Sequence, residues 1–206
     1  MSNITVIDYG YGNIFSLISA LKILGYSPEV TNSPEKIKNS KLLILPGVGA
    51  FKNAMDTLIK LKLDIAIKDC LHKGGKIIGI CLGYQMLFNE SEEFGFTKGL
   101  GLIKGKVIRI NNHSSYKVPN VGWRNLILNE SHNNIFNFDD NGMVYFVHSY
   151  IPLCEDENSV LFYINYNDQL LHASVLNDQI IGFQFHPEKS GPIGLDIFNK
   201  TLKGII

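Results

Sequence analysis

The cysteine at position 81 lies between a short apolar run and the start of a helical pattern. Residues 77–80 read as a buried strand, and the sequence turns helical from Met86 onward. Gly79 and Gly83 flank Cys81 in the pattern G-x-C-x-G, the cysteine counterpart of the strand–turn–helix elbow that exposes a nucleophilic serine. Free N–H groups and the positive end of the helix dipole favour a thiolate there. An isolated cysteine is more often structural, but this setting predicts a nucleophile.

A second group of reactive residues lies far downstream, where residues 180–185 form a strand-like run that leads into His186 and Glu188. Residues two apart in an extended segment project to the same side, so the Glu188 carboxylate can orient the imidazole. Together with Cys81 these side chains predict a relay. Cys81 attacks a carbonyl carbon, His186 transfers the proton, and Glu188 holds His186 in the productive tautomer.

The first half of the chain alternates strand and helix patterns, which is typical of a mostly parallel sheet with crossover helices. The predicted strands are residues 4–7 and 42–45. The predicted helices are one through residues 14–21, one that begins at Ser33-Pro34, and one from Ala50 to about Cys70.

The second half is richer in short β segments, separated by turns that contain Asn and Asp. These strands are expected near residues 107–110, 126–128, 144–147, 160–164 and 180–185, and a last helix is expected over residues 193–202. No repeat or linker interrupts the pattern. We therefore expect a single domain over residues 1–206.

The composition excludes several classes of function. The 206 residues carry 19 basic and 19 acidic side chains, so no global charge attracts nucleic acid or an anionic membrane. The chain contains no signal-peptide pattern and no apolar run of membrane-spanning length. Cys70, Cys81 and Cys154 lack C-x-x-C spacing, and the histidines show no metal-ligand spacing. We expect a cytoplasmic protein without a metal or an organic cofactor.

Two motifs carry a resemblance to a known family. G-I-C-L-G-Y-Q at Gly79–Gln85 and F-H-P-E-K-S at Phe185–Ser190 resemble the class I (triad) glutamine amidotransferases. Further blocks are similar to the glutaminase subunits of imidazole glycerol phosphate synthases, from histidine biosynthesis. These blocks are Val6–Asn13, Leu45–Phe51, Gly99–Ile103, Val118–Trp123 and Tyr145–Tyr150. The resemblance therefore extends over essentially the whole chain.

The resemblance implies an α/β, flavodoxin-like fold, with a mostly parallel central sheet flanked by helices and an additional small antiparallel sheet. It also assigns the glycine-rich loop Gly47, Val48 and Gly49 as the oxyanion strand. An N–H group of this loop and the N–H of Leu82 would stabilise the tetrahedral oxyanion. One such donor typically contributes ~3 kcal/mol of transition-state stabilisation.

The same resemblance assigns the substrate pocket. Gln85 matches the side chain that holds the amino-acid end of L-glutamine, and the backbone of His148, Ser149 and Tyr150 completes the pocket. The implied reaction is hydrolysis of glutamine to glutamate and ammonia. The implied partner is a synthase or cyclase subunit on a separate chain, paired one to one. That (β/α)₈ barrel receives ammonia through a channel and forms imidazole glycerol phosphate and an aminoimidazole carboxamide ribotide. Basal glutaminase activity is expected to be low and to rise with partner and nucleotide.

Four residues are expected to face this partner: Asn13, Asn120, Trp123 and Arg124. The family pattern there is closer to P-H-x-G-W-N, whereas this chain has Asn at 120 and Arg at 124. This departure keeps open a paralogous glutaminase that supplies ammonia to a synthase amidating a bacterial surface sugar. A stand-alone cysteine hydrolase and a catalytically silent binding subunit are further alternatives.

Overall fold

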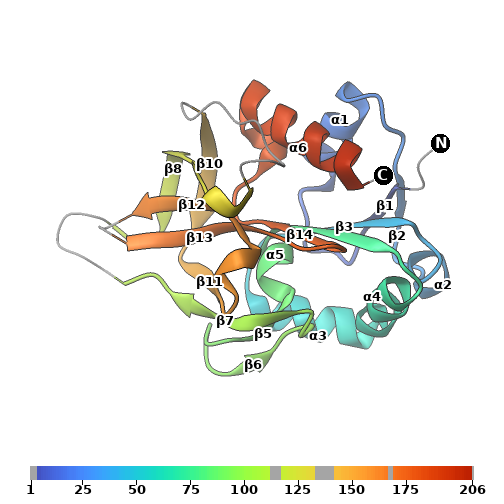
Figure 1. Cartoon of the computed structure of the whole chain (residues 1–206). Helices are drawn as coiled ribbons and strands as arrows, with labels where there is room; N and C mark the ends of the chain where they lie inside the picture. The colour runs from blue at the N-terminus through green and yellow to red at the C-terminus, as the bar shows by residue number, and fades with distance from the viewer. Residues whose placement is uncertain (1–3, 112–116, 133–141, 167–168, 206) are drawn as a thin grey trace.

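The computed structural model describes residues 4–111, 117–132, 142–166 and 169–205 (Figure 1). Its centre is an eight-stranded sheet with the strand order β2-β1-β3-β4-β14-β13-β12-β9. The strands, in that order, are Glu29–Thr31, Ile4–Ile7, Leu42–Gly47, Lys76–Cys81, Ile180–Phe183, Gln169–Leu176, Val160–Tyr166 and Ile127–Leu128. The first five run parallel and the last three pair antiparallel. The parallel strands place the loops that follow them along one edge of the sheet.

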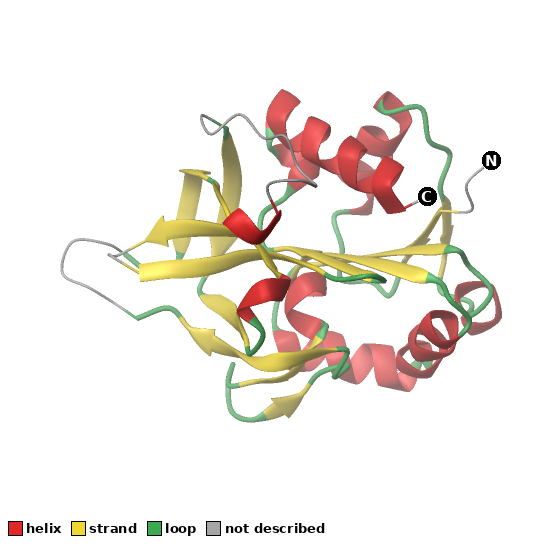
Figure 2. Ribbon diagram, in the orientation of Figure 1, coloured by secondary structure: helices red, strands yellow, loops and turns green. Residues whose placement is uncertain are grey.

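Helices cover both faces of this sheet (Figures 1 and 2). On one face lie α1 (Ile14–Ile23) and α6 (Gly191–Ile205). On the other face lie α2 (Pro34–Ile37), α3 (Phe51–Lys60), α4 (Leu63–His72) and α5 (Leu82–Met86). Three short 3₁₀ turns complete the helical structure: η1 (Glu130–His132), η2 (Glu157–Ser159) and η3 (Pro187–Lys189).

Two smaller sheets flank the carboxyl edge of the central sheet (Figure 2). One has the order β11-β7-β5-β6, and the other pairs β10 with β8. Their strands are Tyr150–Cys154, Ile103–Arg109, Phe88–Ser91 and Thr97–Lys98 in the first, and Met143–His148 and Asn120–Asn125 in the second. The predicted α/β fold is therefore confirmed. In place of one additional antiparallel sheet there are two sheets, of which the β8–β10 pair is antiparallel and the four-stranded sheet is mixed, because β5 pairs with β7 in parallel.

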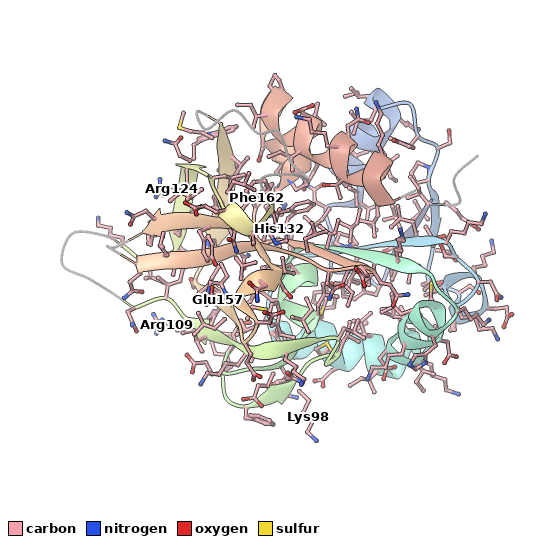
Figure 3. All side chains as sticks on the ribbon, in the orientation of Figure 1. Lys98, Arg109, Arg124, His132, Glu157 and Phe162 are labelled. Carbon is pink, nitrogen blue, oxygen red and sulfur yellow. The ribbon has the colours of Figure 1, made fainter. Side chains whose placement is uncertain are left out.

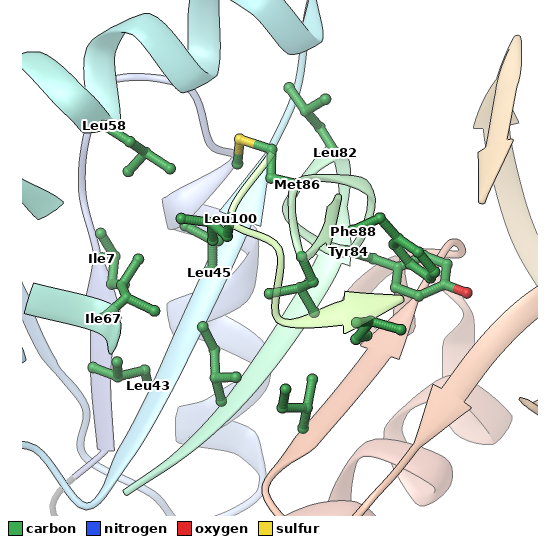
Figure 4. Packing of buried hydrophobic residues seen from close by; sticks show 14 of the residues in the cluster. Ile7, Leu43, Leu45, Leu58, Ile67, Leu82, Tyr84, Met86, Phe88 and Leu100 are labelled. Atoms are coloured by element: carbon green, nitrogen blue, oxygen red, sulfur yellow. The ribbon is translucent and has the colours of Figure 1, made fainter. Parts of the chain in front are cut away.

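Apolar side chains fill the space on both sides of the central sheet (Figure 3). On the α3–α4 face, Leu43 and Leu45 of β3 pack with Leu58 and Ile67 of the covering helices (Figure 4). Burial of each such side chain contributes about 1.5–3 kcal/mol before the conformational entropy cost. The core that fixes β3 and β4 therefore also fixes the loops at their ends.

The structure corrects three predicted elements. The helical pattern expected from Met86 onward is instead the short helix α5, which ends at Met86, and strand β5 begins at Phe88. The helix expected from Ala50 to about Cys70 is two helices, because Lys62 adopts a left-handed backbone with φ of 59° and breaks the hydrogen-bond series between α3 and α4. The strand expected over residues 180–185 ends at Phe183. Six strands were not predicted, because their short or polar-interrupted sequences do not alternate cleanly: β2, β5, β6, β8, β11 and β13.

Gly182 lies directly against the ring of Tyr84, which joins α5 to β14. A Cβ at position 182 would meet the Tyr84 Cδ2 atom at 2.0 Å, and Tyr84 is fully buried. We expect Gly182→Ala to lower the free energy of unfolding by about 1–3 kcal/mol through overpacking, measured by urea denaturation. Gly204→Ala in α6 is the matched control, because a Cβ there meets nothing within 4 Å. Equal stability of the two variants would contradict the assigned contact.

His172 connects β13 to the neighbouring sheet as a neutral acceptor, since its Nδ1 accepts the backbone N–H of Cys154 at 3.0 Å. Burial lowers the pKa of His172, although Glu157, 3.3 Å from Nε2, acts in the opposite direction. A folded-state pKa below the unfolded value of about 6.5 stabilises the fold above that pH, and this stability is lost as pH falls below it.

We therefore expect the wild-type chain to lose more unfolding free energy between pH 7.5 and 5.5 than His172→Asn. The Asn side chain keeps an acceptor for the Cys154 N–H but does not titrate. Urea denaturation at both pH values measures the difference. Parallel losses in the two proteins would show that His172 does not contribute.

Candidate active site

The ends of three adjacent parallel strands bring the predicted catalytic segments together. In the sheet register Gly47 of β3 pairs with Cys81 of β4, and Phe183 of β14 pairs with Ile80. The glycine-rich loop therefore leaves the sheet on one side of Cys81. The segment that carries His186 leaves on the other side. Residues more than a hundred positions apart in the sequence meet here because parallel strands end at the same edge.

Cys81 stands on a strained turn between β4 and α5. Its φ of 55° and ψ of −112° are unusual for a residue with a side chain. The turn leaves no room for side chains beside it: a Cβ on Gly83 would lie 1.8 Å from the Leu45 carbonyl oxygen, and one on Gly79 would lie 2.8 Å from Tyr84 Cα. The G-x-C-x-G spacing is thus a steric requirement of the elbow that the sequence predicted.

His186 contacts both other members of the predicted relay. Its Nδ1 lies 2.9 Å from Glu188 Oε1, and its ring lines the same pocket as Cys81 and interacts with that side chain. The intervening Pro187 begins the η3 turn, so the His186–Glu188 contact arises from a tight turn and not from an extended strand. The three side chains lie together as the sequence predicted.

The contacts of the His186 ring determine its charge. Burial of the ring by itself lowers the pKa of His186, but the hydrogen bonds and negative charges of Cys81 and Glu188 together raise it to about 10. His186 is therefore cationic at neutral pH and faces the sulfur. An imidazolium beside a cysteine favours the nucleophilic thiolate.

Ser190 fixes the position of the histidine turn. Its hydroxyl donates to the His186 carbonyl at 2.6 Å and accepts the Tyr145 backbone N–H at 2.9 Å. The turn is thereby tied to strand β10. Sequence reasoning assigned no role to Ser190, although it is part of the F-H-P-E-K-S motif that carried the resemblance.

A pocket of about 380 Å³ opens above Cys81, which is a volume suited to a small organic substrate. Its walls are formed by Val48, Gly49, Cys81, Leu82, Gln85, Glu93, Pro119, Val147, His148, Ser149, Tyr150 and His186. Predicted oxyanion and substrate residues therefore line one cavity with the predicted nucleophile. Gly47, which lies behind them at the end of β3, is buried.

The backbone carbonyl of Tyr150 organises one wall of the pocket. It accepts hydrogen bonds from Gln85 Nε2 at 2.9 Å and from His148 Nδ1 at 2.9 Å. Burial lowers the pKa of His148 to about 4, despite the opposing effect of the bond to Tyr150. His148 is therefore neutral and serves as a structural contact, in line with the sequence interpretation that it is not a second base.

The glycine-rich loop is held away from the pocket at its central peptide. The Val48 N–H donates to the Tyr11 carbonyl at 2.9 Å, and the Tyr9 hydroxyl donates to the Pro46 carbonyl at 2.9 Å. In this conformation the Val48 N–H is engaged by backbone and does not serve an oxyanion. Leu82, the other expected donor, begins α5 next to Cys81.

The structure does not place Asn120 where a partner was expected, and it leaves Arg124 half-buried, so a partner contact of Arg124 stays a prediction. Asn120 is fully buried, and its Nδ2 lies 2.9 Å from His148 Nε2. The Arg124 guanidinium is turned against the ring of Tyr166, 5.1 Å from its centroid. Alternate residues of a strand point to opposite faces, so both share the inner face of β8.

The other two residues expected to face a partner, Trp123 and Asn13, differ in exposure. Trp123 lies on the outer face of β8 and is 47% exposed, beside Tyr145 of β10. Asn13 is half-buried and caps α1, because its Oδ1 accepts the Ser16 N–H at 3.4 Å. The capping role accounts for Asn13 without a partner.

Glu93 is a pocket residue that sequence reasoning missed. Its Oε2 accepts the backbone N–H of Phe51, the first residue of α3, at 2.7 Å. It lies in the turn between β5 and β6, where its place in a run of acidic residues gave no signal. Only the packing of this turn against α3 brings a carboxylate to the pocket wall.

The described residues contain no cluster of three His, Cys, Asp or Glu side chains that could hold a metal ion. Over the same part of the chain, no helix has the length and apolar character needed to cross a membrane.

Comparison with known proteins identifies close sequence relatives. The family model "Glutamine amidotransferase class-I" matches residues 5–203. Imidazole glycerol phosphate synthase subunit HisH of Geobacillus sp. (strain WCH70) is 44% identical over 198 residues, covering 94% of this chain and 93% of that protein. The protein of the same name from Bacillus subtilis (strain 168) is 42% identical over 205 residues, covering 97% and 95%.

Solved structures agree on the fold. A glutamine amidotransferase matches with a TM-score of 0.73 at 19% identity, covering 97% of this chain and 98% of that one. PurLQS from Thermotoga maritima matches with a TM-score of 0.74 at 23% identity, covering 100% and 99%. With the family model and the sequence relatives, these matches show that the chain belongs to the class I glutamine amidotransferases and, within them, to the family of imidazole glycerol phosphate synthase HisH subunits.

Proposed function

We propose that this chain hydrolyses L-glutamine at Cys81 and delivers the ammonia to a separate cyclase subunit of an imidazole glycerol phosphate synthase. The observation that carries the proposal is that Cys81 and His186 line one pocket of about 380 Å³ and that Glu188 holds the far side of the His186 ring. The relatives are named as the HisH subunit of imidazole glycerol phosphate synthase. These names support both the synthase and a partner subunit.

In the first half-reaction the Cys81 thiolate attacks the side-chain amide carbon of glutamine. A C–S bond forms, and the carbonyl oxygen becomes an oxyanion. His186 then gives its proton to the amide nitrogen, the C–N bond breaks, and ammonia leaves a glutamyl thioester. Glu188 stabilises the cationic ring before transfer and keeps its Nε2 side toward the sulfur.

In the second half-reaction His186, now neutral, takes a proton from water. The resulting hydroxide adds to the thioester carbon, and the C–S bond breaks to release glutamate and the Cys81 thiolate. His186 is again protonated beside the thiolate, which restores the starting ion pair. Atoms balance as glutamine plus water giving glutamate plus ammonia.

The pocket suits the amino-acid end of the substrate. Glu93 supplies a carboxylate for the α-ammonium group, and Gln85 is fixed by the Tyr150 carbonyl so that its amide faces the cavity. The backbone of the 148–150 segment forms the adjoining wall. A charged pair and directed hydrogen bonds would select an α-amino acid with a side-chain amide.

The free chain is expected to be a slow enzyme, because the Val48 N–H is bonded to Tyr11 and the oxyanion lacks this donor. Partner and nucleotide binding would release the bond and turn the peptide toward the pocket. One oxyanion-hole donor is worth about 10²–10³ in rate, so the stimulation should be of that order.

The partner surface is proposed on the outer face of the β8–β10 pair. Exposed apolar side chains gather there from both strands: Val121, Trp123, Met143 and Val147. Because Asn120 is buried and the Arg124 guanidinium lies against Tyr166, their departure from the family pattern does not by itself indicate a different partner. This weakens the residue-level argument for a sugar-amidating paralogue.

A cytoplasmic location is part of this proposal. Cys70, Cys81 and Cys154 are all free thiols, and a catalytic thiol requires a reducing compartment.

Glutamate release from glutamine, measured with the cyclase subunit and its nucleotide ligand, tests the chemistry. We expect Cys81→Ala to abolish release, and Glu188→Gln to lower kcat by roughly a thousandfold, because His186 loses the charge that orients it. A Glu188→Gln variant with wild-type kcat would show that the carboxylate does not support the histidine. Cyclase-dependent stimulation below about tenfold would argue against the loop mechanism.

The partner surface is tested by truncating its aromatic centre. Trp123→Ala should weaken binding of the cyclase subunit by about thirtyfold, because buried tryptophans dominate interface energies. Calorimetric titration measures the affinity, and Ile65→Ala, an exposed apolar residue of α4, is the control. Unchanged affinity in the Trp123 variant would exclude this face as the interface.

A further inference from the structure

Gln184 is a buried polar side chain to which the reaction above gives no role. It follows β14 directly, and no part of it is exposed. Phe183 pairs with Ile80 in the parallel register, so the next residue on each strand, Gln184 and Cys81, lie side by side. The nucleophile thus has Gly47 as its neighbour on one strand and Gln184 on the other.

The direction of the Gln184 amide follows from its neighbours. The Tyr150 carbonyl can only accept, so the Gln85 atom 2.9 Å from it is the Nε2 donor. This same Nε2 lies 3.0 Å from the Gln184 amide, which must therefore present its oxygen there. The remaining Gln184 atom, Nε2, is consequently turned to Cys81, with its nitrogen 3.9 Å from Sγ.

A buried amide N–H requires an acceptor, and here that acceptor is the reactive sulfur. Hydrogen bonds to a charged acceptor are stronger than those to a neutral one. The Gln184 N–H also remains a donor at every step, whereas His186 is neutral between the protonation of ammonia and the removal of a proton from water. The Gln184 donor therefore faces the sulfur throughout, including when the thiolate departs from the thioester carbon.

We propose that Gln184 stabilises the Cys81 thiolate as a hydrogen-bond donor and couples it to Gln85, which faces the substrate. The inference rests on the proposed role of Cys81 as the nucleophile. The oxygen of the Gln184 amide accepts from Gln85, and its nitrogen donates to Cys81. One buried side chain thus joins the pocket residue Gln85 to the nucleophile.

The first test follows alkylation of Cys81 by iodoacetamide as a function of pH, with the Cys81 peptide read by mass spectrometry. We expect Gln184→Met to move the midpoint of this profile upward by about one pH unit, because the thiolate loses a charge-assisted hydrogen bond. The other titrating groups near the sulfur, His186, Glu188 and Tyr9, stay unchanged. A midpoint equal to that of the wild type would overturn the proposal.

Gln179→Met is the matched control. Gln179 precedes β14 at its opposite end, where its Nε2 donates to the Leu71 and Gly75 carbonyls at 3.0 Å each. The control therefore removes partly buried amide hydrogen bonds without touching the site, and its alkylation midpoint should remain that of the wild type. If Gln184→Met does not fold, Gln184→Leu removes the donor without adding a charge beside the sulfur, and the same upward shift is expected.

The second test measures glutaminase kinetics with the cyclase subunit and its nucleotide bound. Gln184→Met should lower kcat by about tenfold with a smaller change in KM. A lower kcat with an unmoved alkylation midpoint would assign Gln184 a structural role only and overturn the proposal. Absence of glutaminase activity in the wild-type complex would refute the proposed function, whereas the alkylation test would still decide the role of Gln184.

Discussion

The contact between Cys81 and His186 is the interaction on which the rest of the site depends. Each side chain stabilises the charged form of the other, and neither would be reactive if it were buried alone. Glu188 holds the imidazolium from behind, and Ser190 ties the turn to β10. The positive charge of His186 lies between the negative charges of Cys81 and Glu188, and no fourth charged group is needed. The pocket above them therefore stays available for a substrate.

Holding these two side chains together imposes steric demands on the central sheet. The left-handed backbone of Cys81 directs the sulfur out of the sheet edge, and the glycines at 79 and 83 let β3 and Tyr84 approach closely. The two apolar cores on either face hold β3, β4 and β14 in register and so absorb the strain of the turn. Core packing therefore helps to hold Cys81 and His186 in position.

Hydrogen bonds between uncharged groups position the side chains around Cys81 and the pocket. One carbonyl, that of Tyr150, fixes the orientation of both Gln85 and His148, and these in turn orient Gln184 and Asn120. The loop on the other side of Cys81 is held by Tyr9 and Tyr11. One side of Cys81 is therefore held by a network of side-chain hydrogen bonds, whereas the loop on the other side is held by the Tyr9 hydroxyl and by one backbone hydrogen bond at Val48.

The sequence by itself predicted that Cys81, His186 and Glu188 act together, and it predicted the alternating α/β order, because each has a local signature in residue type and spacing. It did not determine the break at Lys62, since one left-handed residue leaves the apolar pattern unchanged. Nor did it determine which face of β8 is exposed, so it did not show that Asn120 is buried. The roles of Glu93 and Gln184, and the engaged Val48 N–H, were decided only by tertiary structure. They depend on strand register and loop packing between segments distant in the chain, which no local pattern records.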